Sequence, residues 1–294
     1  MRLSIITINY NDAEGLRKTL ASVAAQTYRD IEHIVIDGGS TDGSVEVIED
    51  YVNQCVMYDV LWVSEKDKGI YNAMNKGIEI ALGRRVVNSF NRSELVEDKN
   101  KVLPDYLQFL NSGDTLAAPD VTERMMASME NGIDILYGDM LKLMPNGEEV
   151  YDVSGGGKEV TLDTFYGGCL NHGPAYIKRS LFDEYGYYDE MLKICSDWKF
   201  YMQSIVLGKA TTKHVDIVVT HFDMNGISET RKNILNEERN RLLKEMVPQG
   251  ILKDYDRYHF PMSQYDRLKK HHLWGLVYFL ERVLFKLEKW GVLR

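Results

Sequence analysis

The sequence predicts an α/β protein with an open sheet flanked by helices, because apolar runs of strand length alternate with segments of helical period. The first run, residues 3–8, is mostly apolar and ends in polar residues, which is typical of a buried parallel strand. A helix is expected to begin near Asn11, with Glu14 three residues later as its capping partner. Repeated strand–helix alternation of this kind favours right-handed βαβ units.

Two further strand–helix pairs follow. Residues 31–36 predict a second strand that ends at Asp37, after which Ser40 or Thr41 is expected to cap a helix. Residues 60–63 predict a third strand. The helix after it should bury one stripe, because its apolar residues recur every four positions: Ile70, Met74, Ile78 and Leu82.

The pattern is less regular beyond residue 83. Residues 84–105 mix charged residues and Asn without a clear period, and we expect them to form an inserted loop. Strands are predicted at 106–110 and 134–137, and Pro-Asn-Gly at 145–147 predicts a hairpin tip. Two helices are expected within 182–208.

Residues 231–294 predict a C-terminal helical extension that carries an apolar stripe with basic residues among it. One interpretation is a helix that packs on the rest of the chain or on a second copy, as in a homodimer. The other is a helix that rests on an anionic membrane surface. The stripe consists of Leu273, Val277, Leu280, Leu284 and Leu287.

The composition limits the class of protein. A net charge of −9 over 294 residues argues against nucleic acid as a partner, because a nucleic-acid binder presents a basic face. Cys55, Cys169 and Cys195 are far apart in the sequence and suit reduced thiols in a cytosol. The apolar run 273–280 is too short to cross a bilayer, and the first ten residues do not read as a signal peptide. We therefore expect a cytoplasmic protein, with peripheral attachment to the inner face of the cell membrane as an option.

Four polar clusters follow predicted strands, at residues 7–11, 37–42, 64–68 and 111–114. In open α/β sheets, ligands bind beyond the carboxyl ends of the strands. The third cluster leads directly into a helix, whose free N–H groups favour an anionic ligand. Each cluster alone is typical of a turn, but together they predict a ligand site at one edge of the sheet.

Three of these segments resemble motifs of one enzyme family. The runs are SIITINYN at the first strand, IDGGSTDGS after the second and SEKDKGIYNAMNKGI after the third. Over residues 1–230 the chain is similar to the family 2 inverting glycosyltransferases with a GT-A type fold, of the kind that builds bacterial surface polysaccharides. The resemblance implies an open mixed sheet in that catalytic domain, followed by the helical extension.

The resemblance also implies roles for particular residues. Asp37 would take the uracil-recognising position, because a carboxylate accepts the imide N–H of uracil. Lys76 would reach the phosphates. The other residues expected to contact the nucleotide-sugar donor are Thr7, Asn9, Tyr10, Glu65, Asp67, Lys68 and Ser112.

The run FLNSGDTL stands where the family carries its metal-binding DXD motif, and it keeps Asp114 as its only carboxylate. One carboxylate can suffice for Mg²⁺ or Mn²⁺ when substrate phosphates supply further oxygens. A plain turn is the alternative. Residues 221–228 are similar to a late glycine-containing loop that lies near the diphosphate in the family.

The run ICSDWKFYM places Asp197 at the start of a helix. The resemblance makes Asp197 the general base that takes a proton from the acceptor hydroxyl. The alternative is a helix-capping carboxylate. His172, Asp139 and Trp198 are further candidates for contact with the acceptor.

The expected function is therefore metal-assisted transfer of a sugar from a UDP-sugar to a hydroxyl of a glycan or a lipid-linked oligosaccharide, in a single displacement. One alternative is a nucleotide-sugar-binding module without transferase activity. Another is a sugar-phosphate nucleotidyltransferase, which would need a Gly-rich basic loop where this chain has the acidic run NYNDAEG.

Overall fold

The computed structural model describes residues 1–294 except 56, 88–92, 95–96, 145, 224–230 and 290–294. The described chain divides into two compact units, Met1–Glu238 and Arg239–Arg294. The first unit thus extends eight residues beyond the predicted boundary at 230. Each unit is considered by itself below.

The first unit contains one mixed, open sheet with strand order β3-β2-β1-β6-β10-β8-β11-β7, and β9 pairs with β8. Strands β1, β2, β3 and β6 run parallel, as predicted, whereas β10, β9 and β7 are antiparallel to their neighbours. The strands are β1 Leu3–Asn9, β2 Ile31–Asp37, β3 Asp59–Ser64, β6 Tyr106–Phe109, β7 Thr115–Leu116, β8 Ile135–Leu143, β9 Glu149–Asp152, β10 Ala175–Lys178 and β11 Thr212–Asp223.

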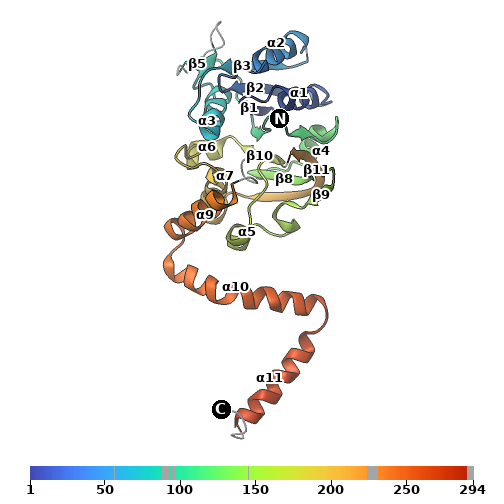
Figure 1. Cartoon of the computed structure of the whole chain (residues 1–294), viewed down its shortest axis with the longest axis vertical. Coiled ribbons are helices and arrows are strands. Elements are labelled where there is room, and N and C mark those ends of the chain that lie inside the picture. Colours follow the sequence, from blue (N-terminus) through green and yellow to red (C-terminus); the bar gives the residue numbers. More distant parts are fainter. Residues whose placement is uncertain (56, 88–92, 95–96, 145, 224–230, 290–294) are drawn as a thin grey trace. The chain divides into compact units, whose positions relative to one another are not determined.

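Helices cover both faces of the parallel half. Helices α1 and α2 contact each other, whereas α3 packs on β1 and β2 from the other side of the sheet (Figure 1). The helices of this unit are α1 Ala13–Ala24, α2 Ser44–Gln54, α3 Ile70–Ala81, α4 Val121–Ala127, α5 Leu162–Gly167, α6 Ser180–Tyr185 and α7 Ser196–Tyr201, with short turns η1 Ser154–Gly157 and η2 Met202–Val206. The predicted helix at 70–82 is therefore confirmed.

Burial explains why the parallel strands form where they do. Every residue of β1 and of β2 is buried, because helices cover both faces of a parallel sheet. Polar residues inside these strands therefore bond to one another. Thr7 Oγ1 lies 3.0 Å from His33 Nε2, and His33 Nδ1 lies 2.8 Å from the Tyr51 hydroxyl.

The irregular segment 84–105 contains a short antiparallel pair, β4 Val86–Val87 with β5 Ser93–Glu94. Residues 88–92 and 95–96 of this predicted insertion lie outside the described residues. The hairpin predicted around 145–147 is confirmed, since β8 pairs with β9 in antiparallel register.

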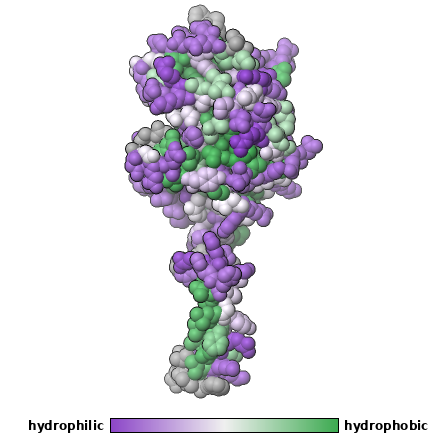
Figure 2. Space-filling model, turned by 90° about the vertical axis from the view of Figure 1, so that its right-hand side faces the viewer, coloured by the Kyte–Doolittle hydropathy of each residue, from purple (hydrophilic) through white to green (hydrophobic). Residues whose placement is uncertain are grey.

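The C-terminal helices are α9 Lys232–Met246, which crosses the boundary between the units, α10 Gln249–Lys270 and α11 Trp274–Lys289. No residue of α11 is buried. The exposed apolar residues of α11 include Leu276, Phe279 and Phe285. Figure 2 shows apolar surface on the C-terminal helices. Within the described residues, no helix combines the length and apolarity needed to span a membrane.

Candidate functional site

The carboxyl ends of β1, β2 and β3 bring three polar side chains into line. Asn9 pairs in register with Asp37, and Asp37 pairs with Ser64. The segment after β6 joins them, because Ser112 N–H donates to the Ile8 carbonyl at 3.0 Å. The four predicted polar clusters therefore do gather at one edge of the sheet.

Asp37 lies at the centre of these polar side chains, and both oxygens of its carboxylate accept hydrogen bonds from the protein. Oδ1 accepts from Asn9 Nδ2 at 2.8 Å and from Ser40 Oγ at 2.6 Å. Oδ2 accepts from Ser64 Oγ at 2.7 Å and from the backbone N–H groups of Gly39 and Ser40. The side chain is 0% exposed, so Asp37 holds the loop after β2 in place and presents no open oxygen.

Asp67 offers a carboxylate at the same edge. Its Oδ1 accepts the Gly69 N–H at 2.9 Å. A Cβ built on Gly38 would lie 2.5 Å from Asp67 Oδ2 and 3.1 Å from Tyr10 Cδ2, so only glycine leaves room for both side chains there. Tyr10 is 67% exposed. An exposed aromatic ring and a carboxylate oxygen therefore meet above Gly38.

Two residues of β1 differ in their suitability for a ligand. Thr7 is completely buried and bonds His33, so its side chain belongs to the core and not to the open edge, contrary to the prediction. Asn9 donates from Nδ2 to Asp37, whereas its buried Oδ1 has no hydrogen-bond partner. Buried amide oxygens nearly always accept a hydrogen bond, so a ligand that donates one to Asn9 Oδ1 is expected.

Lys76 does not extend from the site toward solvent. It is 7% exposed, its Nζ lies 3.1 Å from Glu65 Oε1, and it also donates to the Lys66 carbonyl at 3.2 Å. Lys76 and Glu65 thus fix the turn that carries Asp67, instead of reaching freely for phosphate as predicted. Lys68 remains exposed at the start of α3.

The predicted metal segment forms a turn after β6 in which Asp114 N–H donates to the Asn111 carbonyl at 3.0 Å. Asp114 is buried, and Asn111 Oδ1 is a buried oxygen without a hydrogen-bond partner. Ser112 Oγ donates to Asp12 Oδ2 at 3.1 Å. Among the described residues no group of three His, Cys, Asp or Glu side chains could enclose a metal. The donors present, one carboxylate and one amide oxygen, suit a hard cation that takes its other ligands from elsewhere.

Asp197 lies in the first turn of α7 and is partly exposed. The N-cap of α7 is Cys195, and no side chain caps it, so Asp197 is not the helix cap that the alternative interpretation required. The Tyr71 hydroxyl lies 3.2 Å from Asp197 Oδ1. Tyr71 comes from α3, so the segment after β3 reaches the predicted base.

Two asparagines of α3 also bind the part of the chain that leads into α7. Asn75 exchanges two hydrogen bonds with the backbone of Tyr188, at 2.9 and 3.0 Å. The Glu190 carboxylate accepts from both Asn72 and Asn75. These asparagines join α3 to the loop that precedes α7. The motif spacing alone could not reveal this, because the partners are more than 110 residues away.

Two of the three acceptor candidates have internal partners. Trp198 is 1% exposed and donates from Nε1 to the Phe165 and Gly168 carbonyls, so it lies in the core. Asp139 is 0% exposed and accepts from His214 Nε2 at 2.7 Å and from the Tyr151 hydroxyl. Neither side chain faces an open site, which corrects the prediction for both.

His172 is the remaining acceptor candidate. Its ring stacks on Phe109 with centroids 4.7 Å apart, and Nε2 lies 2.7 Å from the Tyr188 hydroxyl. Burial lowers the pKa of His172 below its ordinary value of 6.5, although Asp197 acts in the opposite direction. His172 is therefore a neutral, well-packed neighbour of Asp197. Residues 224–228 of the late loop predicted to lie near the diphosphate are outside the described residues.

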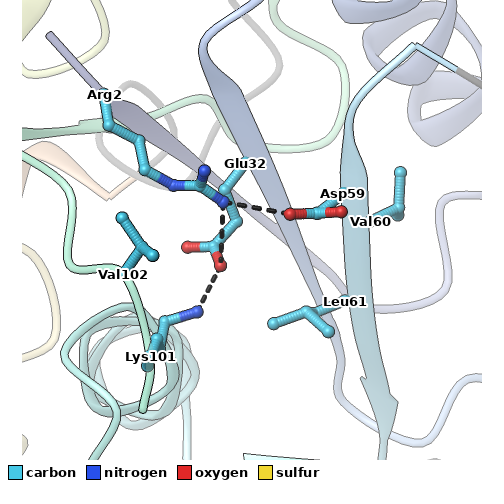
Figure 3. A pocket seen from close by; sticks show the side chains of 7 residues that line it. All are labelled: Arg2, Glu32, Asp59, Val60, Leu61, Lys101 and Val102. Carbon is cyan, nitrogen blue, oxygen red and sulfur yellow. Dashed lines mark hydrogen bonds and ion pairs between the residues drawn. The ribbon is translucent and has the colours of Figure 1, made fainter.

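A separate pocket of about 330 Å³ lies at the amino ends of the strands, among Arg2, Glu32, Asp59, Val60, Leu61, Lys101 and Val102 (Figure 3). Its charges satisfy one another. Arg2 pairs with Asp59 at 3.1 Å, and Lys101 pairs with Glu32. This pocket lies at the amino ends of the strands, whereas Asp67 and Asp114 follow the carboxyl ends of β3 and β6. It is therefore not the nucleotide site that the motifs predict.

Known proteins identify the family of this chain. Residues 4–89 match the family model "Glycosyl transferase family 2". An uncharacterized glycosyltransferase of Mycobacterium tuberculosis is 31% identical over 235 residues, which cover 78% of each chain. A PGL/p-HBAD biosynthesis glycosyltransferase of Mycobacterium bovis is 26% identical over 230 residues, 77% of this chain and 79% of that protein.

Similarity in structure extends over most of the chain. The structure of S. aureus TarS in complex with UDP superposes with a TM-score of 0.60 at 19% identity, over 91% of this chain and 74% of TarS. TarS has also been solved in complex with UDP-GlcNAc. The mixed open sheet with flanking helices is the GT-A fold. The chain is thus an enzyme of glycosyltransferase family 2.

Proposed function

We propose that this glycosyltransferase transfers a sugar from a UDP-sugar to a hydroxyl group of a glycan or lipid-linked oligosaccharide, with inversion at the anomeric carbon. The observation that carries the proposal is the placement of Asp197. This carboxylate is partly exposed at the start of α7 and is joined through Tyr71 to the nucleotide-binding half of the sheet. Support for the donor comes from TarS, whose structures hold UDP and UDP-GlcNAc.

The uracil base is assigned to the edge around Gly38. Tyr10 supplies an exposed ring against which a base can stack, and Asp67 Oδ2 supplies an acceptor for the imide N–H. Asn9 Oδ1 is a second acceptor at this edge, buried and without a hydrogen-bond partner. Asp37 contributes indirectly, because it fixes Asn9, Ser40 and Ser64 around this edge.

The leaving diphosphate is assigned to the turn after β6. Asp114 and Asn111 would hold Mg²⁺ or Mn²⁺ there together with the diphosphate oxygens. A divalent cation in this position supplies neutralisation of the charge that develops on UDP as it leaves.

Asp197 is assigned to the acceptor side. The acceptor oxygen forms its bond to the anomeric carbon while the bond from that carbon to UDP breaks, and the hydroxyl proton passes to Asp197. The tyrosines beside Asp197 stay protonated at neutral pH, because burial and the nearby Asp197 charge raise the pKa of Tyr71, Tyr188 and Tyr201. Asp197 is therefore the group that accepts the proton.

The C-terminal unit is assigned to an anionic membrane surface, where a lipid-linked acceptor would be found. Residues 266–294 contain seven Lys and Arg but three Asp and Glu, although the whole chain has a net charge of −9. Exposed Leu276, Phe279 and Phe285 on α11 supply apolar area for the interface. A second copy of the chain is the competing occupant of the same apolar face.

The test of the transfer proposal is a panel of UDP-, GDP- and CDP-sugars, with release of the nucleotide measured for the wild type, Asp197→Asn and Asp120→Asn. Asp120 is the matched control, because it is exposed and its side chain makes no cap bond. Loss of a general base costs about 10²–10⁴ in rate. We expect that loss for Asp197→Asn with UDP-sugars, together with normal UDP binding, and wild-type behaviour for Asp120→Asn.

Each rival has its own outcome in this assay. A binding module would bind UDP-sugars but release no nucleotide in the wild type. A nucleotidyltransferase would also release no nucleoside diphosphate from the panel, but it would form a nucleotide-sugar and pyrophosphate when supplied with a nucleoside triphosphate and a sugar phosphate. Equal rates for wild type and Asp197→Asn would remove Asp197 from the role of base.

A further inference from the structure

We infer that Tyr71 is the positioning residue of the general base: its hydroxyl bridges the Ile194 carbonyl and the Asp197 carboxylate, so that it holds the base in place and stabilises its ionised form. The inference rests on the proposed role of Asp197. It gives helix α3, which begins beside the proposed nucleotide site, a second role at the general base.

The geometry around the Tyr71 hydroxyl carries the argument. The hydroxyl accepts the Ser196 N–H at 3.1 Å, lies 3.2 Å from Asp197 Oδ1 and donates to the Ile194 carbonyl. Three groups at the start of α7, from Ile194, Ser196 and Asp197, therefore converge on one oxygen atom. The Tyr71 side chain is 5% exposed, so water does not replace these bonds.

A phenol has one proton, and here it has two acceptors within reach. An ionised carboxylate is the stronger acceptor, whereas a protonated carboxyl group is a weaker one. When Asp197 is ionised, the proton is drawn toward Asp197. When Asp197 has taken the acceptor's proton, the Tyr71 proton turns fully to the Ile194 carbonyl. The bridge thus favours the ionised base, and it keeps the Ile194 carbonyl paired when Asp197 is protonated.

The other titratable groups beside Asp197 are neutral. The titratable groups that face Asp197 within the described part of the chain are Tyr71 from α3, Tyr188 from the loop after α6, Tyr201 from α7 itself and His172 from the segment before β10. All are neutral at pH 7, because burial lowers the pKa of His172 and raises the pKa of each tyrosine. The Tyr71 hydroxyl therefore stabilises the charged Asp197 carboxylate by a hydrogen bond, as a nearby cation stabilises other carboxylates.

The experiment compares Tyr71→Phe with a matched control, Tyr106→Phe. Tyr106 is 6% exposed and its hydroxyl also donates to a backbone carbonyl, that of Ile133 at 2.6 Å, but it does not contact Asp197. Both variants lose one buried tyrosine–carbonyl bond, and Tyr71→Phe also loses the bonds to Ser196 N–H and Asp197, so its stability should fall further. The carboxyl carbon of Asp197 is followed by ¹³C NMR in protein labelled at aspartate, and Asp197→Asn identifies the resonance.

We expect Tyr71→Phe to move the measured titration of the Asp197 carboxyl carbon to higher pH, because a hydrogen bond to the charged form is lost, and Tyr106→Phe to leave it unchanged. The acidic limb of the pH–rate profile for UDP release from UDP-GlcNAc should move upward equally, with KM unchanged. If Tyr71→Phe fails to fold, 3-fluorotyrosine at position 71 keeps the shape and makes a stronger donor, and it should lower the pKa of Asp197.

An unchanged Asp197 titration in Tyr71→Phe, or in the 3-fluorotyrosine protein, overturns the inference. This outcome is separate from failure of the proposed function. If Asp197→Asn retains full transfer, the base assignment is wrong whatever the titration shows. If Asp197→Asn is inactive but the titration does not respond to position 71, only the role of Tyr71 is wrong.

Discussion

The carboxylate of Glu238 in α9 accepts the backbone N–H of Ile194 at 3.0 Å, three residues before the proposed base. The same carboxylate accepts the N–H groups of Lys193 at 2.7 Å and Cys195 at 3.0 Å. These donors belong to the loop that leads into α7, where backbone N–H groups have no intrahelical partner. Glu238 and Tyr71 therefore hold the same short segment from two distant parts of the chain.

Replacement of Glu238 by Gln should loosen this segment. The amide keeps one oxygen but turns an N–H₂ group toward backbone donors, so at least one charge-assisted bond is lost, each worth about 1.5–3 kcal/mol before solvent screening. We expect nucleotide release from a UDP-sugar to fall roughly tenfold, with UDP affinity unchanged by calorimetry. Glu237→Gln is the control, because Glu237 is exposed. Equal activity of the two variants would contradict a role for Glu238.

Asp37 and Asp67 should respond differently to the same change. Asp37→Asn places an amide among five donors, so we expect a loss of stability on the order of 2 kcal/mol without any ligand. Asp67→Asn should melt like the wild type when no nucleotide is present. It should lose most of the stabilisation by UDP, which is about 2.7 kcal/mol at 100 times Kd.

Thermal unfolding with UDP and with GDP measures both effects. The wild type should be stabilised more by UDP than by GDP. A full UDP response in Asp67→Asn would return the base-reading role to Asn9 or Asp37.

The parallel half of the fold was predictable because its signals are local. Strand-length segments rich in Ile and Val mark β1 and β2, and the four-residue spacing in α3 marks the face that packs on them. The antiparallel strands β7, β9 and β10 are two to four residues long and carry no comparable pattern. Their pairing depends on partners distant in sequence, which no local pattern reports.

The site was predictable as a location but not as a set of contacts. Strand ends bring Asn9, Asp37 and Ser64 together whatever their side chains do. A carboxylate is available to a ligand only if few protein donors surround it. The number of donors around Asp37 and around Asp67 is set by the folded conformation of the loops, which the sequence pattern does not report. Glu238 gave no sequence signal, since it is one of several acidic residues in a polar helix.

Metal binding should depend on the nucleotide. Asp114 and Asn111 provide too few oxygens for a cation alone, so we expect Mn²⁺ to bind much more tightly when UDP is present. Calorimetry with and without UDP measures this coupling, and Asp114→Ala should abolish it. Asp120→Ala serves as the control. Equal Mn²⁺ affinity with and without UDP would contradict a shared site.

The last prediction concerns α11. Leu280→Glu and Leu284→Glu place charges on its apolar stripe but leave the catalytic unit, Met1–Glu238, intact. If the stripe enters an anionic membrane surface, the wild type should sediment with phosphatidylglycerol vesicles but not with phosphatidylcholine vesicles. The double variant should remain in solution with unchanged nucleotide release. Salt at about 1 M, where the screening length is about 3 Å, should weaken the binding. If the stripe instead joins two copies, the wild type should ignore vesicles, and the double variant should halve the mass measured by light scattering.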